Sequence, residues 1–290
     1  MLRSRLARRL AEVGFAIGDR VAPPFMFDCA RHLFSEWERR PEGWVEGAGI
    51  KGWDEKSVAD AQARHWPILC RNVEGSGPLG VSHLPTHLSR YDPGDHNTVM
   101  SYAYVLALAS HHRDRLAILD WGGGLGHYYM YSRALLPDVA LDFDCYDVPI
   151  LCNLGRTVSP EVTFHEDVAD LRERTFDLVV SSSSLHYFRD WRATLQRLIE
   201  ATGTFLYVAR LQTVLHEPTF VALQRPHRSG YFTEYLSWFL NREEFLDCVA
   251  SKGMEVIREF VYAEQWRVRG CHEVGVSRGF LLRPNVPAAT

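Results

Sequence analysis

The sequence predicts an α/β protein: a seven-stranded, mostly parallel sheet with one antiparallel strand, plus a helical N-terminal region. From residue 97 onward, short apolar runs alternate with helical runs, which is the order that builds a parallel sheet. The last two apolar runs are joined by a segment too short for a crossover helix, so we expect them to pair antiparallel. Residues 1–96 instead hold short helical pieces broken by proline and glycine turns.

We therefore divide the chain into a helical N-terminal cap or dimerisation region, residues 1–96, and a sheet domain, residues 97–290. Helical periodicity in the first region covers residues 27–39 and 54–70, the latter with Pro67 near its end. Arginines and leucines alternate over the first thirteen residues as an amphipathic basic helix, without the apolar core of a secretory signal. We expect this helix to pack on its own domain or on a second subunit. Weak association with an anionic membrane surface is the alternative.

In the second region, each expected strand is a short apolar run between turn or helix signals. The expected strands are residues 116–121, 139–146, 162–165, 176–181, 204–209, 255–262 and 276–282. The expected helices are residues 97–110, 127–136, 149–157 and 191–201, and one that begins after Asn241. Asn241, with Glu244 three residues later, matches a capping box at the start of this last helix.

Composition excludes several classes of protein. The chain has 290 residues, of which 46% are hydrophobic and 23% charged, as in a globular domain. It has no apolar run of about 18 residues, so we expect no membrane-spanning helix. Its net charge of −4 argues against a nucleic-acid partner. Six scattered cysteines without a C-x-x-C pair predict reduced thiols, and hence a cytoplasmic protein.

We expect no metal ion. One group of potential ligands lies close together in the sequence: His83, His87, Asp92, Asp95 and His96. Pro85 interrupts any helix that would place the first two histidines on one face, and the remaining spacing matches no known zinc site.

The strongest motif is D-W-G-G-G-L-G, which begins at Asp120, directly after an apolar strand and before a helix. Glycine lets the backbone turn tightly and approach a ligand closely. The amides at the start of the next helix favour an anionic group there. A dinucleotide fingerprint, G-x-G-x-x-G, would require glycine at position 127, where this chain has His127. The observed spacing, D-x-G-x-G-x-G, therefore argues against a nicotinamide loop.

This spacing resembles motif I of the class I S-adenosylmethionine-dependent methyltransferases. The resemblance implies a Rossmann-like class I methyltransferase fold, the cofactor S-adenosyl-L-methionine and the product S-adenosyl-L-homocysteine. It also implies that Asp120 contacts the methionyl amino group, Asp147 the ribose hydroxyls and Asp167 the adenine amino group. Each acid follows or ends one of three successive expected strands. The other implied cofactor contacts are Gly122, Gly123, Gly124, Gly126, Val148, Val168 and Ser183.

The strand over residues 176–181 is followed by S-S-S-L-H-Y-F, which resembles the L-H-x-W region of the phenolic O-methyltransferases. In that family the histidine deprotonates the acceptor hydroxyl, which implies His186 as the general base. An unperturbed histidine pKa of about 6.5 suits this role. The match is partial, because Tyr187 and Phe188 stand where the family has an acid or amide followed by tryptophan. A histidine that merely packs beneath the cofactor or orders a loop is the alternative.

The C-terminal third, with R-L-Q-T from Arg210 and G-Y-F-T-E-Y-L-S-W from Gly230, resembles a group of bacterial methyltransferases often encoded beside surface-polysaccharide genes. This resemblance implies a saccharide acceptor. We expect aromatic faces and an anion-holding pair in the acceptor pocket. The expected acceptor-binding residues are Arg210, His216, Tyr231, Tyr235 and Trp238.

The sequence thus predicts an S-adenosylmethionine-dependent O-methyltransferase that transfers a methyl group in line to a saccharide or saccharide-linked hydroxyl. Its acceptor would be a small molecule or a glycan. One alternative is an O-methyltransferase of a small aromatic or secondary metabolite. Another is a non-catalytic protein that binds the cofactor and a partner. The atom methylated and the existence of a homodimer stay open, because pocket shape depends on loop packing.

Overall fold

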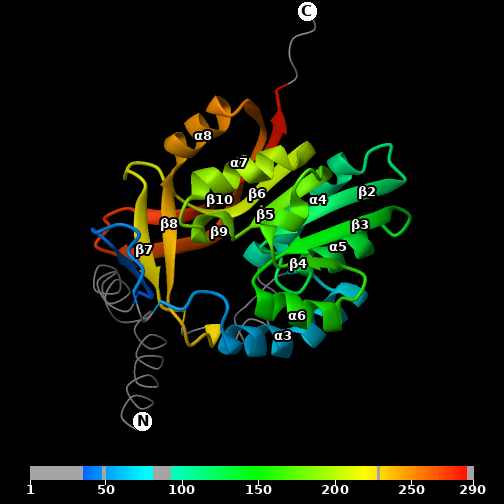
Figure 1. Ribbon diagram of the computed structural model, residues 1–290, viewed down its shortest axis with the longest axis horizontal. Coiled ribbons are helices and arrows are strands. Elements are labelled where there is room, and N and C mark those ends of the chain that lie inside the picture. Colours follow the sequence, from blue (N-terminus) through cyan, green and yellow to red (C-terminus); the bar gives the residue numbers. More distant parts are fainter. Residues whose placement is uncertain (1–34, 48–49, 81–92, 227–228, 286–290) are drawn as a thin grey trace, which may run out of the picture.

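The computed structural model describes residues 35–47, 50–80, 93–226 and 229–285. Five parallel strands, in hydrogen-bonded order, form the centre of its sheet: β4 (Thr163–His165), β3 (Ala140–Tyr146), β2 (Arg115–Trp121), β5 (Phe176–Ser182) and β6 (Thr202–Val214). The hairpin of β9 (Met254–Arg269) and β10 (Val274–Pro284) extends it, with β10 antiparallel to both β6 and β9. The predicted α/β fold with one reversed strand among these seven is confirmed (Figure 1).

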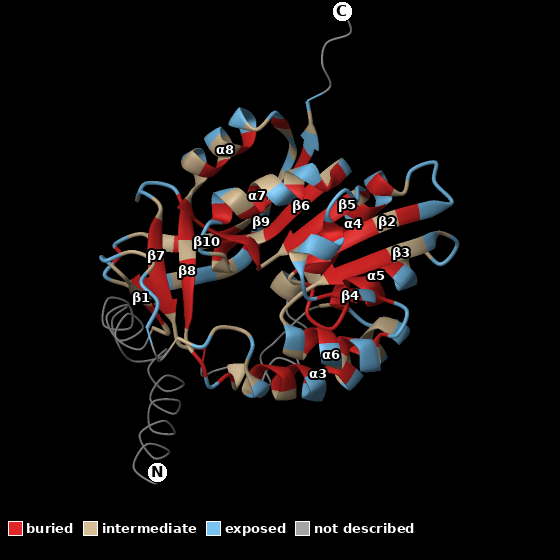
Figure 2. Cartoon of the chain, viewed as in Figure 1, coloured by how far each residue is buried: buried red, intermediate tan, exposed pale blue. Residues whose placement is uncertain are grey.

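Helices cover both faces of the sheet (Figure 1). They are α3 (Lys56–Glu74), α4 (Pro93–Ala109), α5 (His127–Leu135), α6 (Pro149–Val158), α7 (Trp191–Glu200) and α8 (Arg242–Ser251). One apolar core lies between the sheet and α3 to α6, and a second lies between the sheet and α7 and α8. Figure 2 shows the buried central strands and the exposed outer faces of α3, α6 and α8. All the predicted helices from residue 54 onward are confirmed, with ends that differ by a few residues.

Among the described residues, the sheet has ten strands rather than the seven predicted, because three further strands close one end of it into a ring. They are β1 (Trp37–Arg39), β7 (Phe220–Gln224) and β8 (Tyr235–Asn241). The ring runs from the end of β6 through β8, β7 and β1 to β9, β10 and back to β6. Trp37, Phe220 and Phe239 pack inside it, with both ring pairs to Phe239 at 5.2 Å.

The prediction of a helix over residues 27–39 is wrong for the part that the structure describes, because Ser35 and Glu36 are not helical and Trp37–Arg39 form β1. Trp37 is buried in the ring core, and its strand hydrogen-bonds to β7 and β9, which outweighs the local helical pattern. The predicted strands over residues 204–209 and 255–262 are too short, since β6 and β9 continue until they reach the ring. The basic N-terminal helix, residues 27–34 and the potential ligands His83, His87 and Asp92 lie outside the described residues.

The cap of α8 is confirmed in part. The Asn241 side chain accepts the backbone N–H groups of Glu243 and Glu244, at 3.0 and 3.2 Å. The Glu244 carboxylate does not close the box on Asn241. It accepts the N–H of Thr219 instead, while the Asn241 N–H donates to the Thr219 hydroxyl. This exchange ties the start of α8 to the residue just before β7.

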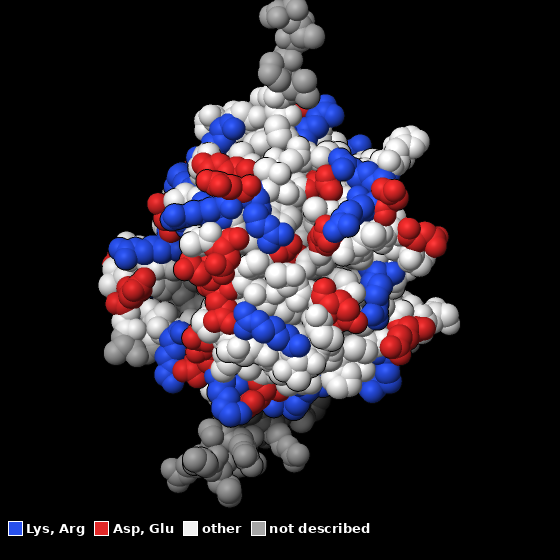
Figure 3. All heavy atoms as spheres, turned by 45° about the vertical axis from the view of Figure 1, so that its right-hand side comes forward, with Lys and Arg blue, Asp and Glu red and all other residues white. Residues whose placement is uncertain are grey.

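The surface carries both signs of charge. On the face in Figure 3, acidic and basic side chains are interspersed, with uncharged surface between them. Ion pairs of the described residues include Arg115 with Asp142 and Arg156 with Glu166. Among the described helices, none combines the length and the apolar content that a membrane crossing requires.

Candidate functional site

The glycine-rich loop connects β2 to α5 and lies against two other strand ends. Gly122, Gly124 and Gly126 all have positive φ angles, of 77°, 63° and 91°. A Cβ on Gly122 would lie 2.4 Å from the Ser184 Cβ, and one on Gly123 would lie 2.3 Å from Asp120 Oδ2. The backbone therefore passes so close to the ends of β2 and β5 that only glycine fits.

Asp120, near the end of β2, is an unpaired buried carboxyl group. Its side chain is 1% exposed, and neither carboxyl oxygen has a hydrogen-bond partner among the described residues. Burial, and secondly the nearby Asp147 carboxylate, raise the pKa of Asp120 well above its usual value. A buried carboxylate without a partner is costly. The position is therefore suited to a ligand that brings a positive charge or a hydrogen-bond donor.

Asp147, at the end of β3, fixes the glycine loop. Its Oδ2 accepts the N–H of Gly124 and its Oδ1 accepts the N–H of Val148, both at 2.7 Å. Burial raises the pKa of Asp147 to about 6, although these two hydrogen bonds oppose the shift. Each carboxylate oxygen has a further lone pair. Asp147 can therefore hold the loop and still accept hydrogen bonds from two adjacent hydroxyls.

The remaining predicted cofactor residues lie at the same edge of the sheet. Asp167 is exposed after β4, and its carboxylate accepts the Ala169 N–H at 2.8 Å as the cap of the 3-10 helix η1 (Val168–Leu171). Val168 is half-buried at the start of η1. Ser183, after β5, has a φ of 53°, uncommon for a residue with a side chain, and its N–H donates to Ala209. The structure thus brings all three predicted acids to the carboxyl ends of β2, β3 and β4.

His186 lies in the 3-10 helix η2 (Leu185–Tyr187), directly after β5, and is 1% exposed. Neither ring nitrogen has a partner among the described residues. Burial, together with the positive charge of Arg210, lowers the pKa of His186 to about 3. The imidazole is therefore neutral at neutral pH, with one nitrogen that can accept a proton or a hydrogen bond.

This low pKa predicts that acid destabilises the fold through His186. Between the unfolded pKa of about 6.5 and the folded pKa of about 3, only the unfolded chain binds the proton, so stability is lost as the pH falls. From pH 7.5 to pH 5 the loss should be about 2 kcal/mol. In His186→Gln this loss is absent, so the difference in unfolding free energy between wild type and variant should shift by that amount. Urea unfolding at both pH values measures it, and an unchanged difference would contradict the assignment.

Arg210, in β6, forms a half-buried ion pair. Its Nε and Nη2 donate to the carboxylate of Glu264, which also accepts from the Ser277 hydroxyl at 2.9 Å. Burial alone raises the pKa of Glu264, but Arg210 lowers it below its usual value. The φ of Arg210 is 51°, a strained conformation for an arginine. An anionic acceptor would therefore have to share Arg210 with Glu264.

Of the four other predicted acceptor residues, two tyrosines lie close together, and a tryptophan and a histidine lie elsewhere. Tyr231 and Tyr235 are buried, and neither hydroxyl has a partner among the described residues. Trp238 points to the other face of β8, because side chains alternate along a strand, and its Nε1 donates to backbone carbonyls of the loop after η2. His216 is exposed in the loop after β6, where its backbone N–H donates to Glu273.

Sequence reasoning missed two residues that contact this site. Trp53 stacks on Tyr235, with ring centroids 4.4 Å apart. Gln62, in α3, has a buried side-chain oxygen without a described partner, 3.0 Å from where a Cβ on Gly124 would lie. Tryptophans within the glycine-rich stretch of residues 43–53 were a detectable signal for Trp53. Nothing in the sequence around Gln62 indicates that α3 packs over the glycine loop.

Comparison with known proteins identifies the family of this chain. A family model described as a methyltransferase domain matches residues 98–259, more than half of the chain. Among solved structures, the chain is 11% identical to a protein proposed to be a sarcosine dimethylglycine methyltransferase from Galdieria sulphuraria, with a TM-score of 0.50 over 78% of this chain and 98% of that one. It is 15% identical to magnesium protoporphyrin IX methyltransferase from Synechocystis PCC 6803, with a TM-score of 0.46 over 77% and 97%. No curated protein matches the sequence.

Proposed function

Because this chain belongs to the methyltransferase-domain family, we propose that it is an S-adenosylmethionine-dependent O-methyltransferase acting on a saccharide or saccharide-linked hydroxyl. The observation that carries the proposal is the buried, unpaired carboxyl group of Asp120 beside the glycine loop. In such a site a cationic ammonium group is a fitting partner, since it supplies the charge that the buried carboxylate lacks.

The residues at the strand ends fit the cofactor. Asp120 would pair with the ammonium group of its methionine part, and Asp147 would accept the two ribose hydroxyls. Asp167 would accept from the adenine amino group, beside Val168. When bound, S-adenosylmethionine supplies a methyl group on a positively charged sulfur atom, and S-adenosylhomocysteine remains after transfer.

In the proposed reaction, His186 accepts the proton of the acceptor hydroxyl as its oxygen is methylated. The neutral imidazole has a free lone pair for this proton, and the buried position keeps competing water away from it. The positive charge of Arg210 disfavours a persistent imidazolium, so the imidazole loses this proton to water once the methylated product leaves. The family itself assigns neither the base nor the acceptor.

Further support concerns the acceptor and the setting. The resemblance of the C-terminal third to bacterial methyltransferases encoded beside surface-polysaccharide genes supports a saccharide. The five described cysteines are all free thiols, which supports a cytoplasmic protein. We also propose that residues 1–20 pack on the domain or form a homodimer. A protein that is still a dimer in solution after these residues are deleted would remove the second role.

The test is calorimetric titration of the full chain with S-adenosylmethionine and S-adenosylhomocysteine. We expect one molecule bound per chain at micromolar affinity, after which an acceptor screen that detects released S-adenosylhomocysteine becomes informative. If neither compound binds, the methyltransferase proposal fails and the interaction-protein alternative takes its place.

Asp147→Ala should weaken S-adenosylmethionine binding by about 1–3 kcal/mol, because the ribose hydroxyls lose a charged acceptor and the loop loses its hydrogen bond. The matched control is Asp142→Ala, an exposed acid on the same strand that pairs with Arg115. Equal affinity for wild type and Asp147→Ala would remove the ribose assignment.

A further inference from the structure

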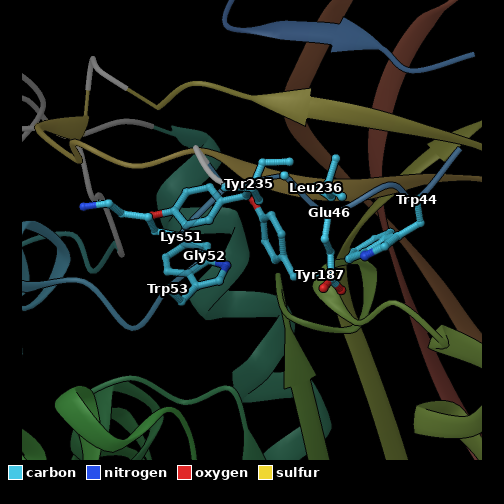
Figure 4. A pocket seen from close by; sticks show the side chains of 10 residues that line it. Trp44, Glu46, Lys51, Gly52, Trp53, Tyr187, Tyr235 and Leu236 are labelled. Carbon is cyan, nitrogen blue, oxygen red and sulfur yellow. The ribbon is translucent and has the colours of Figure 1, made fainter. Parts of the chain in front are cut away.

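A hollow of about 460 Å³ lies beside η2 and the first residues of β8 (Figure 4). One wall consists of Trp44, Glu46, Gly47 and residues 50–53. The other wall consists of Tyr187 from η2 and Tyr235 and Leu236 from β8. The first wall precedes the family-matched part of the chain, which begins at residue 98, so the family says nothing about what this hollow binds.

The first wall is fixed to the second by hydrogen bonds. The Gly52 N–H donates to the Glu234 carbonyl at 3.2 Å, and the Gly52 carbonyl accepts from the Thr233 hydroxyl at 2.9 Å. On the side of the first wall, the Lys51 ammonium group pairs with the carboxylate of Glu55, four residues later, at 2.8 Å. The hollow is therefore formed before a ligand arrives, as most small-molecule sites are.

The hollow also adjoins the candidate base. Tyr187 directly follows His186, with their ring centroids 4.4 Å apart. The Tyr187 hydroxyl donates to the Gln224 side chain on β7, which holds the ring in place. A molecule in the hollow would therefore lie against the residue next to His186.

The arrangement of rings does not favour a flat aromatic ligand. Such a ligand gains most contact when it stacks between two parallel rings. The two parallel pairs here are closed on themselves: Trp53 with Tyr235 at 4.4 Å, and Trp44 with Trp238 at 5.7 Å. Tyr187 meets both Trp53 and Tyr235 edge to face. The hollow thus offers ring faces and edges along its walls, but no slot.

Charged groups line the same hollow. Glu46 and Lys51 both contribute to its walls, and their side chains are 68% and 58% exposed. A carboxylate accepts hydrogen bonds from hydroxyls, and an ammonium group donates to them. A saccharide ring matches this combination, because its C–H face packs on aromatic rings while its hydroxyl edge needs charged or polar partners.

We propose that this hollow is the acceptor site and that it binds a saccharide ring, with Trp44 and Glu46 as specificity-determining residues. Calling the occupant the methyl acceptor rests on the proposed function; the saccharide-binding property does not.

The experiment is saturation-transfer NMR of the full chain with methyl glycosides of glucose, galactose, mannose and rhamnose, in the presence of S-adenosylhomocysteine. We expect transfer to the ring C–H protons of at least one glycoside. Trp44→Ala should weaken its binding about tenfold, since an aromatic contact is worth up to about 1.5 kcal/mol. Glu46→Gln, which is exposed and leaves the packing intact, is the second variant if Trp44→Ala does not fold. Tyr104→Ala is the control, because this exposed aromatic side chain lies on α4, outside the hollow.

Three results would overturn the inference: no glycoside binds, both hollow variants bind as wild type does, or catechol displaces the glycoside with higher affinity. Calorimetry with S-adenosylhomocysteine on the same samples separates this failure from that of the proposed function. A protein that binds S-adenosylhomocysteine but no glycoside contradicts the saccharide site alone. A protein that binds a glycoside through Trp44 but no S-adenosylhomocysteine contradicts the methyltransferase proposal alone.

Discussion

Asp120→Asn is expected to lower the affinity for S-adenosylmethionine at least about 100-fold, which corresponds to about 2.7 kcal/mol. The reason is that the ammonium group would enter a buried site without its counter-charge, and removing one partner of a buried charge pair costs about 2–5 kcal/mol. Calorimetric titration measures the loss. Asp142→Asn, an exposed acid on β3, is the control and should bind as wild type does.

The free protein should respond in the opposite direction. Because the carboxyl oxygens of Asp120 are buried without described partners, Asn at this position removes an unfavourable charge, and the unliganded variant should be at least as stable as wild type. The raised pKa gives the sign of the Asp120 contribution: the stability that wild type has relative to the variant falls as the pH rises above the unfolded value of about 3.8. An Asp120→Asn protein that keeps its affinity within threefold would contradict the ammonium assignment.

The cofactor edge was predictable because its signals are local. The D-x-G-x-G-x-G motif places Asp120 and the glycines within seven residues. Asp147 and Asp167 follow short apolar strands, and parallel strands bring such positions to one edge. The sequence could not show that Asp147 binds the Gly124 N–H or that Asp120 lacks a partner, since both depend on contacts between loops far apart in the chain.

The ring of strands was not predictable, because its pairings are distant and short. The three residues of β1 pair with residues more than 180 positions away, and no local pattern marks so short a strand. Missing β8 had a consequence for the site. Along a strand, Tyr235 and Ser237 share one face, whereas Leu236 and Trp238 share the other. Recognising β8 would therefore have separated Trp238 from Tyr235 before the structure was known.

The environment of His186 was equally hidden from the sequence. Arg210 lies 24 positions later in the chain. Its own positive φ and its hydrogen bonds to Glu264, on another strand, determine where its side chain lies. The L-H-Y-F stretch suggested a histidine with an ordinary pKa, and the structure gives one lowered to about 3. This difference changes the expected pH profile but leaves the base candidate in place.

His186→Ala is expected to lower kcat about 10²- to 10⁴-fold with an acceptor hydroxyl found by screening, which is the usual contribution of a general base. Affinity for S-adenosylhomocysteine should stay within about threefold, because the cofactor residues proposed here lie mainly on other strand ends. His272→Ala is the control, because this exposed histidine lies between β9 and β10 and does not line the proposed acceptor site. Initial rates at saturating cofactor measure the effect.

Stability and cofactor affinity then distinguish a base from a structural histidine, because a histidine with so low a pKa gives no limb in the pH profile in either role. With a pKa of about 3, His186 is neutral over the whole pH range of the assay. We therefore expect no ascending limb of kcat near pH 6.5, either in wild type or in His186→Gln. If His186 has a purely structural role, replacing it by Ala or by Gln should lower stability and cofactor affinity together. If His186→Ala keeps its kcat, the base assignment is wrong, and a carboxylate or an amine becomes the favoured acceptor. Arg210, shared with Glu264, would then be the residue that binds a carboxylate.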